Sequence, residues 1–150
     1  MTEVFLNFHM DRICAYKFSE EQKSQILSVI REVLAREDEI IFAMVYGSFV
    51  EDLPFRDIDL GIYVKNLNTT SYFDYEFDIS QKVQLALESN IPIDVRIVNL
   101  APLPFKFRVI TGMLLFTQED RVWEEFAIEV ARAYLDMAPL REKYILESIR

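Results

Sequence analysis

Three aspartates and one Gly-Ser pair are the residues of this sequence whose types and spacing could support chemistry. Gly47-Ser48 is followed after eight residues by Asp57-x-Asp59, and Asp94 comes about 35 positions later. On strands, side chains two positions apart share a face about 7 Å apart, and a neighbouring strand runs about 4.8 Å away. Three carboxylates could then converge and hold two Mg²⁺ ions roughly 4 Å apart, the arrangement used for in-line phosphoryl displacement.

Each part of this set also has an ordinary structural explanation. A Gly-Ser pair is typical of the turn that ends a strand, although its glycine lets the backbone approach a phosphate and its serine offers a hydroxyl and an N–H. Acids on a strand can simply face water and discourage edge pairing. We favour a site because these residues occur together in order, each acid flanked by aliphatic residues that point inward.

Apolar periodicity predicts the elements that must position these residues. The alternating run 57–64 places aliphatic side chains on one face and Asp57 and Asp59 on the other, and 91–98 repeats the pattern with Asp94 and Arg96 outward. The aromatic-rich start of a helix over 71–89 could equally be extended. The other expected elements are helices over 19–37 and 102–111, strands over 40–46 and 113–117, and one or two helices across 119–149, broken around Pro139.

These elements predict an α+β fold, with a mixed sheet, helices packed on one face of it and a C-terminal helical segment. A length of 150 residues matches a single domain over 1–150. The formal charge of −9 argues against nucleic acid or anionic lipid as a partner. With one cysteine, no signal-peptide pattern and no apolar run of about 20 residues, we expect a cytoplasmic protein that does not span a membrane.

Three segments together resemble the minimal nucleotidyltransferases of the polymerase-β superfamily, and in particular the MntA-like antitoxins of HEPN/MNT toxin–antitoxin pairs. The family's strand, Gly-Ser turn and Asp-x-Asp hallmark are similar to VYGSFVEDLPFRDIDLGIYV. Its third-carboxylate strand, with the following helix and glycine, looks like PIDVRIVNLAPLPFKFRVITGMLLF. Its C-terminal helix resembles WEEFAIEVARAYLDMAPLREKY, where Tyr134 and Asp136 form a Tyr-x-Asp pair.

The resemblance implies a polymerase-β-like nucleotidyltransferase domain and an enzyme that uses ATP as substrate and Mg²⁺ as cofactor, with two ions expected. Asp57 and Asp59 would bind the metal ions, and Asp94 would complete the metal site and help to activate the acceptor hydroxyl. Gly47 and Ser48 would hold the triphosphate. The implied reaction transfers AMP to a tyrosine hydroxyl of a partner HEPN toxin, a ribonuclease that the modification silences, so the chain would act as an antitoxin.

The residues after the Gly-Ser pair depart from the family pattern. Family members usually carry an Arg there, in a slightly longer loop, whereas this chain has Phe49, Val50, Glu51 and Asp52. Acids beside a phosphate site are unfavourable without positive charge nearby. We choose Arg96 as its source because alternation puts it on the Asp94 face, although a surface ion pair explains this residue equally well. The other candidates are Arg56, Lys65 and Arg108.

Two other functions stay open. The altered loop is compatible with a catalytically impaired member that neutralises its partner by forming a complex alone. A third function is that of a small-molecule nucleotidyltransferase resembling antibiotic-modifying enzymes. Binding of ATP and Mg²⁺, together with a mass gain on the partner, separates the enzyme from the binding module. The oligomeric state is also left open.

Overall fold

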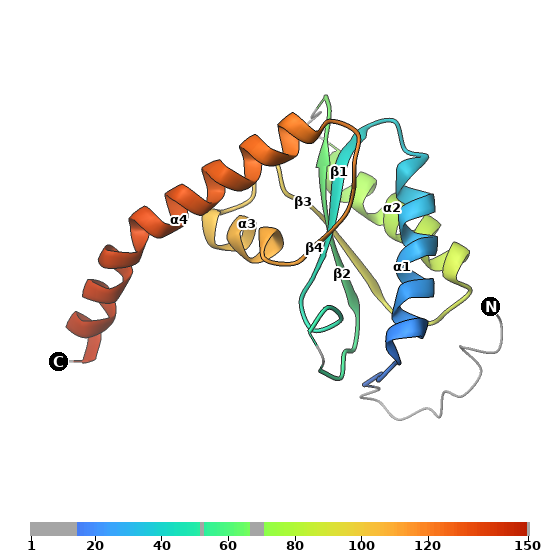
Figure 1. Ribbon diagram of the computed structural model, residues 1–150, viewed down its shortest axis with the longest axis horizontal. Helices are drawn as coiled ribbons and strands as arrows, with labels where there is room; N and C mark the ends of the chain where they lie inside the picture. Colours follow the sequence, from blue (N-terminus) through green and yellow to red (C-terminus); the bar gives the residue numbers. More distant parts are fainter. Residues whose placement is uncertain (1–14, 52, 67–70, 150) are drawn as a thin grey trace.

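A four-stranded mixed sheet organises the computed structural model, which describes residues 15–51, 53–66 and 71–149 (Figure 1). Strand β1 (Ile40–Tyr46) pairs antiparallel with β2 (Ile58–Val64) and with β4 (Met113–Thr117). Strand β3 (Ile93–Ile97) pairs parallel with β2. The strand order is therefore β3-β2-β1-β4, which places β1 and β2 at the centre.

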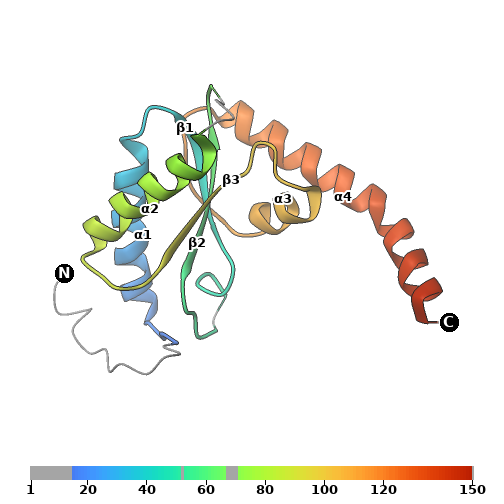
Figure 2. The same cartoon turned by 180° about the vertical axis from the view of Figure 1, so that it is seen from behind.

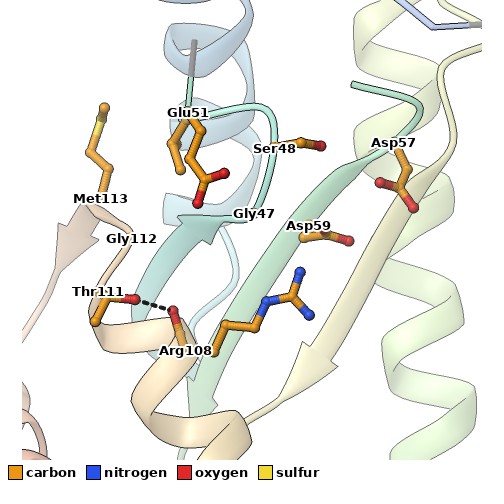
Figure 3. A pocket seen from close by; sticks show the side chains of 10 residues that line it. Gly47, Ser48, Glu51, Asp57, Asp59, Arg108, Thr111, Gly112 and Met113 are labelled. Atoms are coloured by element: carbon orange, nitrogen blue, oxygen red, sulfur yellow. Dashed lines mark hydrogen bonds between the residues drawn. The ribbon is translucent and has the colours of Figure 1, made fainter. Parts of the chain in front are cut away.

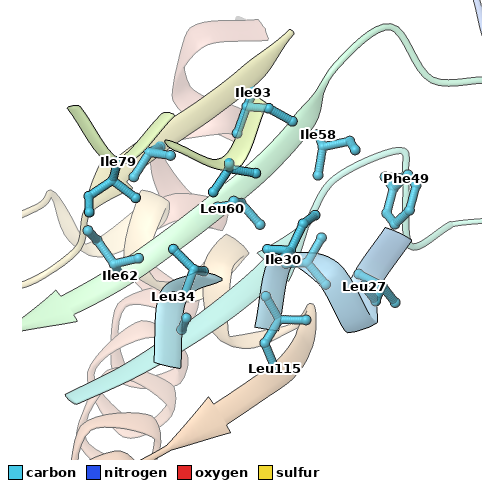
Figure 4. Close-up of a cluster of buried hydrophobic side chains, with 14 of the residues drawn as sticks. Leu27, Ile30, Leu34, Phe49, Ile58, Leu60, Ile62, Ile79, Ile93 and Leu115 are labelled. Carbon is cyan, nitrogen blue, oxygen red and sulfur yellow. The ribbon is translucent and has the colours of Figure 1, made fainter. Parts of the chain in front are cut away.

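Two helices cover one face of this sheet. Helix α1 (Glu20–Ala35) begins with the expected capping box, in which Ser19 and Gln22 exchange side-chain-to-backbone hydrogen bonds. Helix α2 (Tyr72–Leu87) packs against α1 and β3. The aliphatic side chains of β2 and β3 point to these helices, as the alternation predicts, and form the larger core (Figure 4). Its fully buried members include Ile30, Leu34, Ile58, Leu60, Ile62 and Ile79.

The opposite face is also covered, which corrects the expectation that helices pack on one face only. Helix α3 (Leu103–Ile110) and the first part of α4 (Asp120–Ile149) lie on this side (Figures 1 and 2). Phe42, Met44 and Tyr46 of β1 point there and form a second core with Val109 and Phe126. The physical reason is that β1 is apolar and buried at all seven positions, so both of its faces need cover.

Helix α4 runs without a break through Pro139, so the expected interruption there is wrong. A proline inside a helix removes one hydrogen bond and crowds the preceding turn. Pro139 and Leu135, four residues before it, are both exposed, so water can reach the carbonyl that loses its donor. The helix therefore continues into a half that extends away from the sheet (Figure 1).

The remaining elements are confirmed, with ends within two residues of the predicted ones, and the aromatic start of 71–89 is helical from Tyr72 onward. The α+β fold with a mixed sheet is confirmed. Cys14 and Asp52 lie outside the described residues, and the single domain over 1–150 stays a prediction. Of the described helices, none is both long and apolar enough to cross a bilayer.

Candidate active site

A cavity of about 670 Å³ opens where β1 ends, β2 begins and α3 finishes (Figure 3). The turn after β1 contributes Gly47 and Ser48 to its wall, and the start of β2 contributes Asp57 and Asp59. The end of α3 contributes Arg108. Four of the residues expected at the site are thus brought together around one concave surface.

Asp94 lies beside this cavity and not in its wall. The parallel register of β2 and β3 makes Asp59 and Asp94 direct Cα partners, which confirms that these acids lie side by side on adjacent strands. However, the Asp94 carboxylate accepts a hydrogen bond of 3.0 Å from Nε of Arg96, and Asp94 lines a smaller groove between α2 and β3. Arg96 therefore shares the Asp94 face as expected, but it does not line the larger cavity.

The negative charge at this edge of the sheet changes the acidity of Asp59. Partial burial, together with the charges of Asp57 and Asp94, raises the pKa of its carboxyl from 3.8 to about 6, while Arg108 and Arg96 oppose this rise. The pKa of the buried Tyr46 hydroxyl is raised far above its usual range by the same burial and by Asp59 and Asp94. The site thus concentrates more negative than positive charge.

Gly47 brings the backbone close to the acids. Its φ of +81° lies in the left-handed region, and a Cβ at this position would lie 2.5 Å from Oδ2 of Asp59. The N–H of Val50 donates to the Gly47 carbonyl at 3.2 Å, which closes the turn. A residue larger than glycine would therefore strain the backbone and displace the Asp59 carboxylate.

The burial of Phe49 explains why an aromatic residue follows the Gly-Ser pair in this chain. Its side chain is only 1% exposed, and its ring packs edge-on against Phe55 with centroids 4.8 Å apart. It belongs to the same core as α1 and β2. This position anchors the turn in the hydrophobic interior, so it is not available to bind phosphate.

Arg108 is one of the candidate cations named from the sequence, but the alternation favours Arg96 over it. Among the described residues that line the cavity, Arg108 is the only cation. It reaches the cavity because α3 lies close to β2: a Cβ on Gly61 would be 2.7 Å from Cγ1 of Val109. Local periodicity could not reveal this, because the approach depends on a contact between residues far apart in the chain.

Comparison with known proteins places this geometry in a family. Residues 28–121 match the family model described as polymerase beta, nucleotidyltransferase. The chain belongs to this nucleotidyltransferase family. The resemblance inferred from the sequence is thereby confirmed, and so is the polymerase-β-like fold. Among curated protein sequences, none matches the chain significantly.

Solved structures similar to this nucleotidyltransferase come from toxin–antitoxin complexes. One holds a tri-AMPylated Shewanella oneidensis HEPN toxin with its MNT antitoxin; the match has 19% identity, a TM-score of 0.63, and covers 85% of this chain and 99% of that one. A toxin–antitoxin structure with AMP-PNP matches at 20% identity and a TM-score of 0.61, over 85% and 98% of the two chains. The MntA–HepT pair matches at 18% identity and a TM-score of 0.58, over 88% and 100%.

The donor groups of this nucleotidyltransferase suit a hard divalent cation shared with a phosphate. Asp57 and Asp59 are half-buried, and neither forms an ion pair with another described residue. Mg²⁺ commonly takes one or two carboxylates together with substrate phosphate oxygens. In the described part of the chain, no three His, Cys, Asp or Glu side chains surround one point closely enough to hold an ion. Asp94, the third carboxylate of the expected set, is instead paired with Arg96.

Proposed function

We propose that this chain transfers AMP from ATP to a tyrosine hydroxyl of a partner HEPN toxin and so acts as a cytoplasmic antitoxin. The observation that carries the proposal is the cavity in which Asp57 and Asp59 face the Gly47-Ser48 turn, with Asp94 next to Asp59 on β3. Support also comes from the similar solved structures, one with an AMPylated HEPN toxin and one with AMP-PNP.

The roles follow from where each group lies. The N–H groups and hydroxyl of the Gly47-Ser48 turn bind phosphate oxygens of ATP. Asp57 and Asp59 would hold Mg²⁺, and Asp94, next to Asp59 on β3, would complete the site as the third carboxylate. Two bound ions would supply charge neutralisation for the phosphate oxygens. Arg96 holds the Asp94 carboxylate in place through the hydrogen bond of 3.0 Å.

In the transfer, the hydroxyl oxygen of the acceptor attacks the α-phosphorus of ATP. The bond from this phosphorus to the oxygen bridging to the β-phosphorus breaks, and pyrophosphate leaves with the bonding electron pair. Asp94 accepts the hydroxyl proton, which then passes to water. The products are the adenylylated tyrosine, pyrophosphate and one proton, and the chain contributes positioning and charge more than covalent chemistry.

The test is label transfer from ATP labelled at the α-phosphate to the product of the adjacent gene, expected to be a HEPN protein, in the presence of Mg²⁺. Asp57→Ala and Asp59→Ala should each abolish transfer. Asp38→Ala is the matched control, because Asp38 is exposed in the turn before β1, at the opposite end of that strand from Gly47. Unchanged transfer in either cavity variant would refute the proposal.

One observation favours the alternative of a binding module that neutralises its partner without modifying it. Glu51 lines the cavity, so the turn brings an acid where the family usually brings an arginine. In that case the purified chain would still form a complex with the HEPN protein and inhibit it, while the mass of the HEPN protein would stay unchanged after incubation with ATP and Mg²⁺.

A further inference from the structure

We propose that Arg108, on α3, binds the polyphosphate of the nucleotide and supplies the positive charge that the Gly47-Ser48 turn lacks. This assignment rests on the proposed function, because it deepens the account of how the same cavity takes ATP. It replaces the choice of Arg96 made from the sequence with a residue that comes from another part of the chain.

The first argument is the charge balance of the cavity wall. The charged side chains there are Glu51, Asp57, Asp59 and Arg108. A polyphosphate that enters this space brings several more negative charges, and even a bound cation leaves the balance negative. Arginine is well suited to the remaining task, because its planar fork donates two parallel hydrogen bonds to phosphate oxygens.

The second argument is position. A terminal nitrogen of the Arg108 guanidinium lies 3.6 Å from the point where a Cβ on Gly47 would be. Figure 3 shows the guanidinium reaching from α3 to the space beside Asp59, facing the turn that carries Ser48. A phosphate bound to the N–H groups of the turn would therefore meet the guanidinium on its other side.

The third argument is that the surroundings fix the backbone of Arg108 before any ligand binds, while its exposed side chain lines the cavity. Its neighbour Val109 is fully buried and packs over Gly61, which sets the height of α3 above β2. The guanidinium lies 5.5 Å from the centre of the Tyr46 ring, in a cation–π contact. The Thr111 hydroxyl donates to the Arg108 carbonyl at 2.8 Å and closes the end of the helix.

The other candidate cations are placed elsewhere. Arg96 donates to Asp94, and Lys106 lies over the Phe126 ring at 5.8 Å. Neither Arg56 nor Lys65 is in the wall of the cavity, as far as the described residues define it. A polyphosphate in the cavity therefore meets Arg108 first.

The experiment compares Arg108→Gln and Arg108→Lys with Lys106→Gln, a control on the same helix whose side chain lies outside the cavity wall. The affinities of ATP, AMP-PNP, AMP and adenosine are measured by calorimetry with Mg²⁺ present. Arg108→Gln should weaken ATP and AMP-PNP by about tenfold or more, because a charge-assisted bidentate contact is lost. Adenosine should be affected less than about twofold, Arg108→Lys should lie between, and Lys106→Gln should match the wild type.

Two results would overturn the assignment. One is an Arg108→Gln variant that binds ATP as tightly as the wild type. The other is an equal loss of ATP and adenosine binding in both Arg108 variants, which would show that the residue only supports the structure. This result can be distinguished from a failure of the proposed function. If ATP binding depends on Arg108 but the wild type never labels the HEPN protein, AMP transfer is refuted and the assignment of Arg108 still holds.

Discussion

Asp59 and Asp94 are direct neighbours across the parallel pair of β2 and β3, so two acidic side chains lie side by side on adjacent strands. Like charges opposite one another on a sheet are destabilising. The pKa of Asp59 is raised first by its partial burial, and then by the charges of Asp57 and Asp94. The folded chain therefore carries an electrostatic cost at the position that a cation would relieve.

Removing that charge should stabilise the free protein. The pKa of Asp59 rises from 3.8 to about 6 on folding, so the folded chain binds the proton more tightly than the unfolded chain. The stability that this proton contributes is complete below about pH 3.8 and is lost as pH rises through about 6. Asp59→Asn should therefore raise the Tm in metal-free buffer at about pH 7.5, and the gain should shrink toward about pH 4. Solvent screens a half-buried group, so we expect about 1 kcal/mol rather than the roughly 3 kcal/mol of the full shift.

The measurement is thermal unfolding of both proteins with a chelator at the two pH values. A gain of about 1 kcal/mol corresponds to about 2–4 °C for a chain of this size. Asp38→Asn, at an exposed acid away from the cavity, serves as the control. An Asp59→Asn variant that is less stable at the higher pH would contradict the electrostatic explanation.

Gly47→Ala should damage the site more than the fold. The positive φ costs a residue with a side chain about 1 kcal/mol, and the new methyl group would meet the Asp59 carboxylate. We expect a loss of about 1–2 kcal/mol in the free energy of unfolding and a much larger loss of ATP binding. Ser48→Ala, next to it, should leave stability within about 0.5 kcal/mol of the wild type. Denaturant unfolding and calorimetry check both parts, and full ATP affinity in Gly47→Ala would argue against the close approach.

Gly61→Ala should push α3 away from the sheet. Its new methyl group would lie 2.7 Å from Val109 and 3.1 Å from Val98, and overpacking of this kind costs about 1–3 kcal/mol. In a Val109→Ala background the same substitution should cost less, because the closest contact is removed and only the one with Val98 remains. A double-mutant cycle measures this coupling, which we expect to exceed about 0.5 kcal/mol. Additive effects would mean that Val109 does not rest on Gly61.

Phe49→Ala should destabilise the whole fold although the residue lies next to the Gly-Ser turn. The ring is fully buried, and truncating a buried phenylalanine costs about 3–5 kcal/mol. Leu53→Ala, in the same connection but 55% exposed, should cost less than about 1 kcal/mol. Urea unfolding distinguishes the two, and equal small effects would place Phe49 at the surface.

The sequence pattern predicted the acidic strands because alternation is a local property. Asp59 and Asp94 each lie in a run of alternating inward aliphatics, so their common face could be inferred before the register was known. The roles assigned to the site residues stay predictions until the variants are measured; these residues are Gly47, Ser48, Asp57, Asp59, Asp94 and Arg96.

The features that the sequence did not reveal depend on contacts between distant segments. Arg108 reaches the cavity because Gly61 has no side chain, which lets Val109 and therefore α3 approach β2. Arg96 lies outside the cavity wall and donates a hydrogen bond to Asp94. Helices cover both faces of β1, because the strand is buried at every position. Periodicity alone could not distinguish this arrangement from a strand covered on one face. The continuous α4 shows that an exposed Pro139 is tolerated where water can satisfy the freed carbonyl.

The wall of the cavity joins the turn after β1, the start of β2, the end of α3 and the start of β4. A small molecule bound in this cavity would contact all of these segments at once and would have no comparable binding site in the unfolded chain. At a concentration a hundred times its Kd, such a ligand adds about 2.7 kcal/mol to the free energy of unfolding. The rise in Tm that each nucleotide causes can thus rank ATP against other nucleotides in the absence of the acceptor protein.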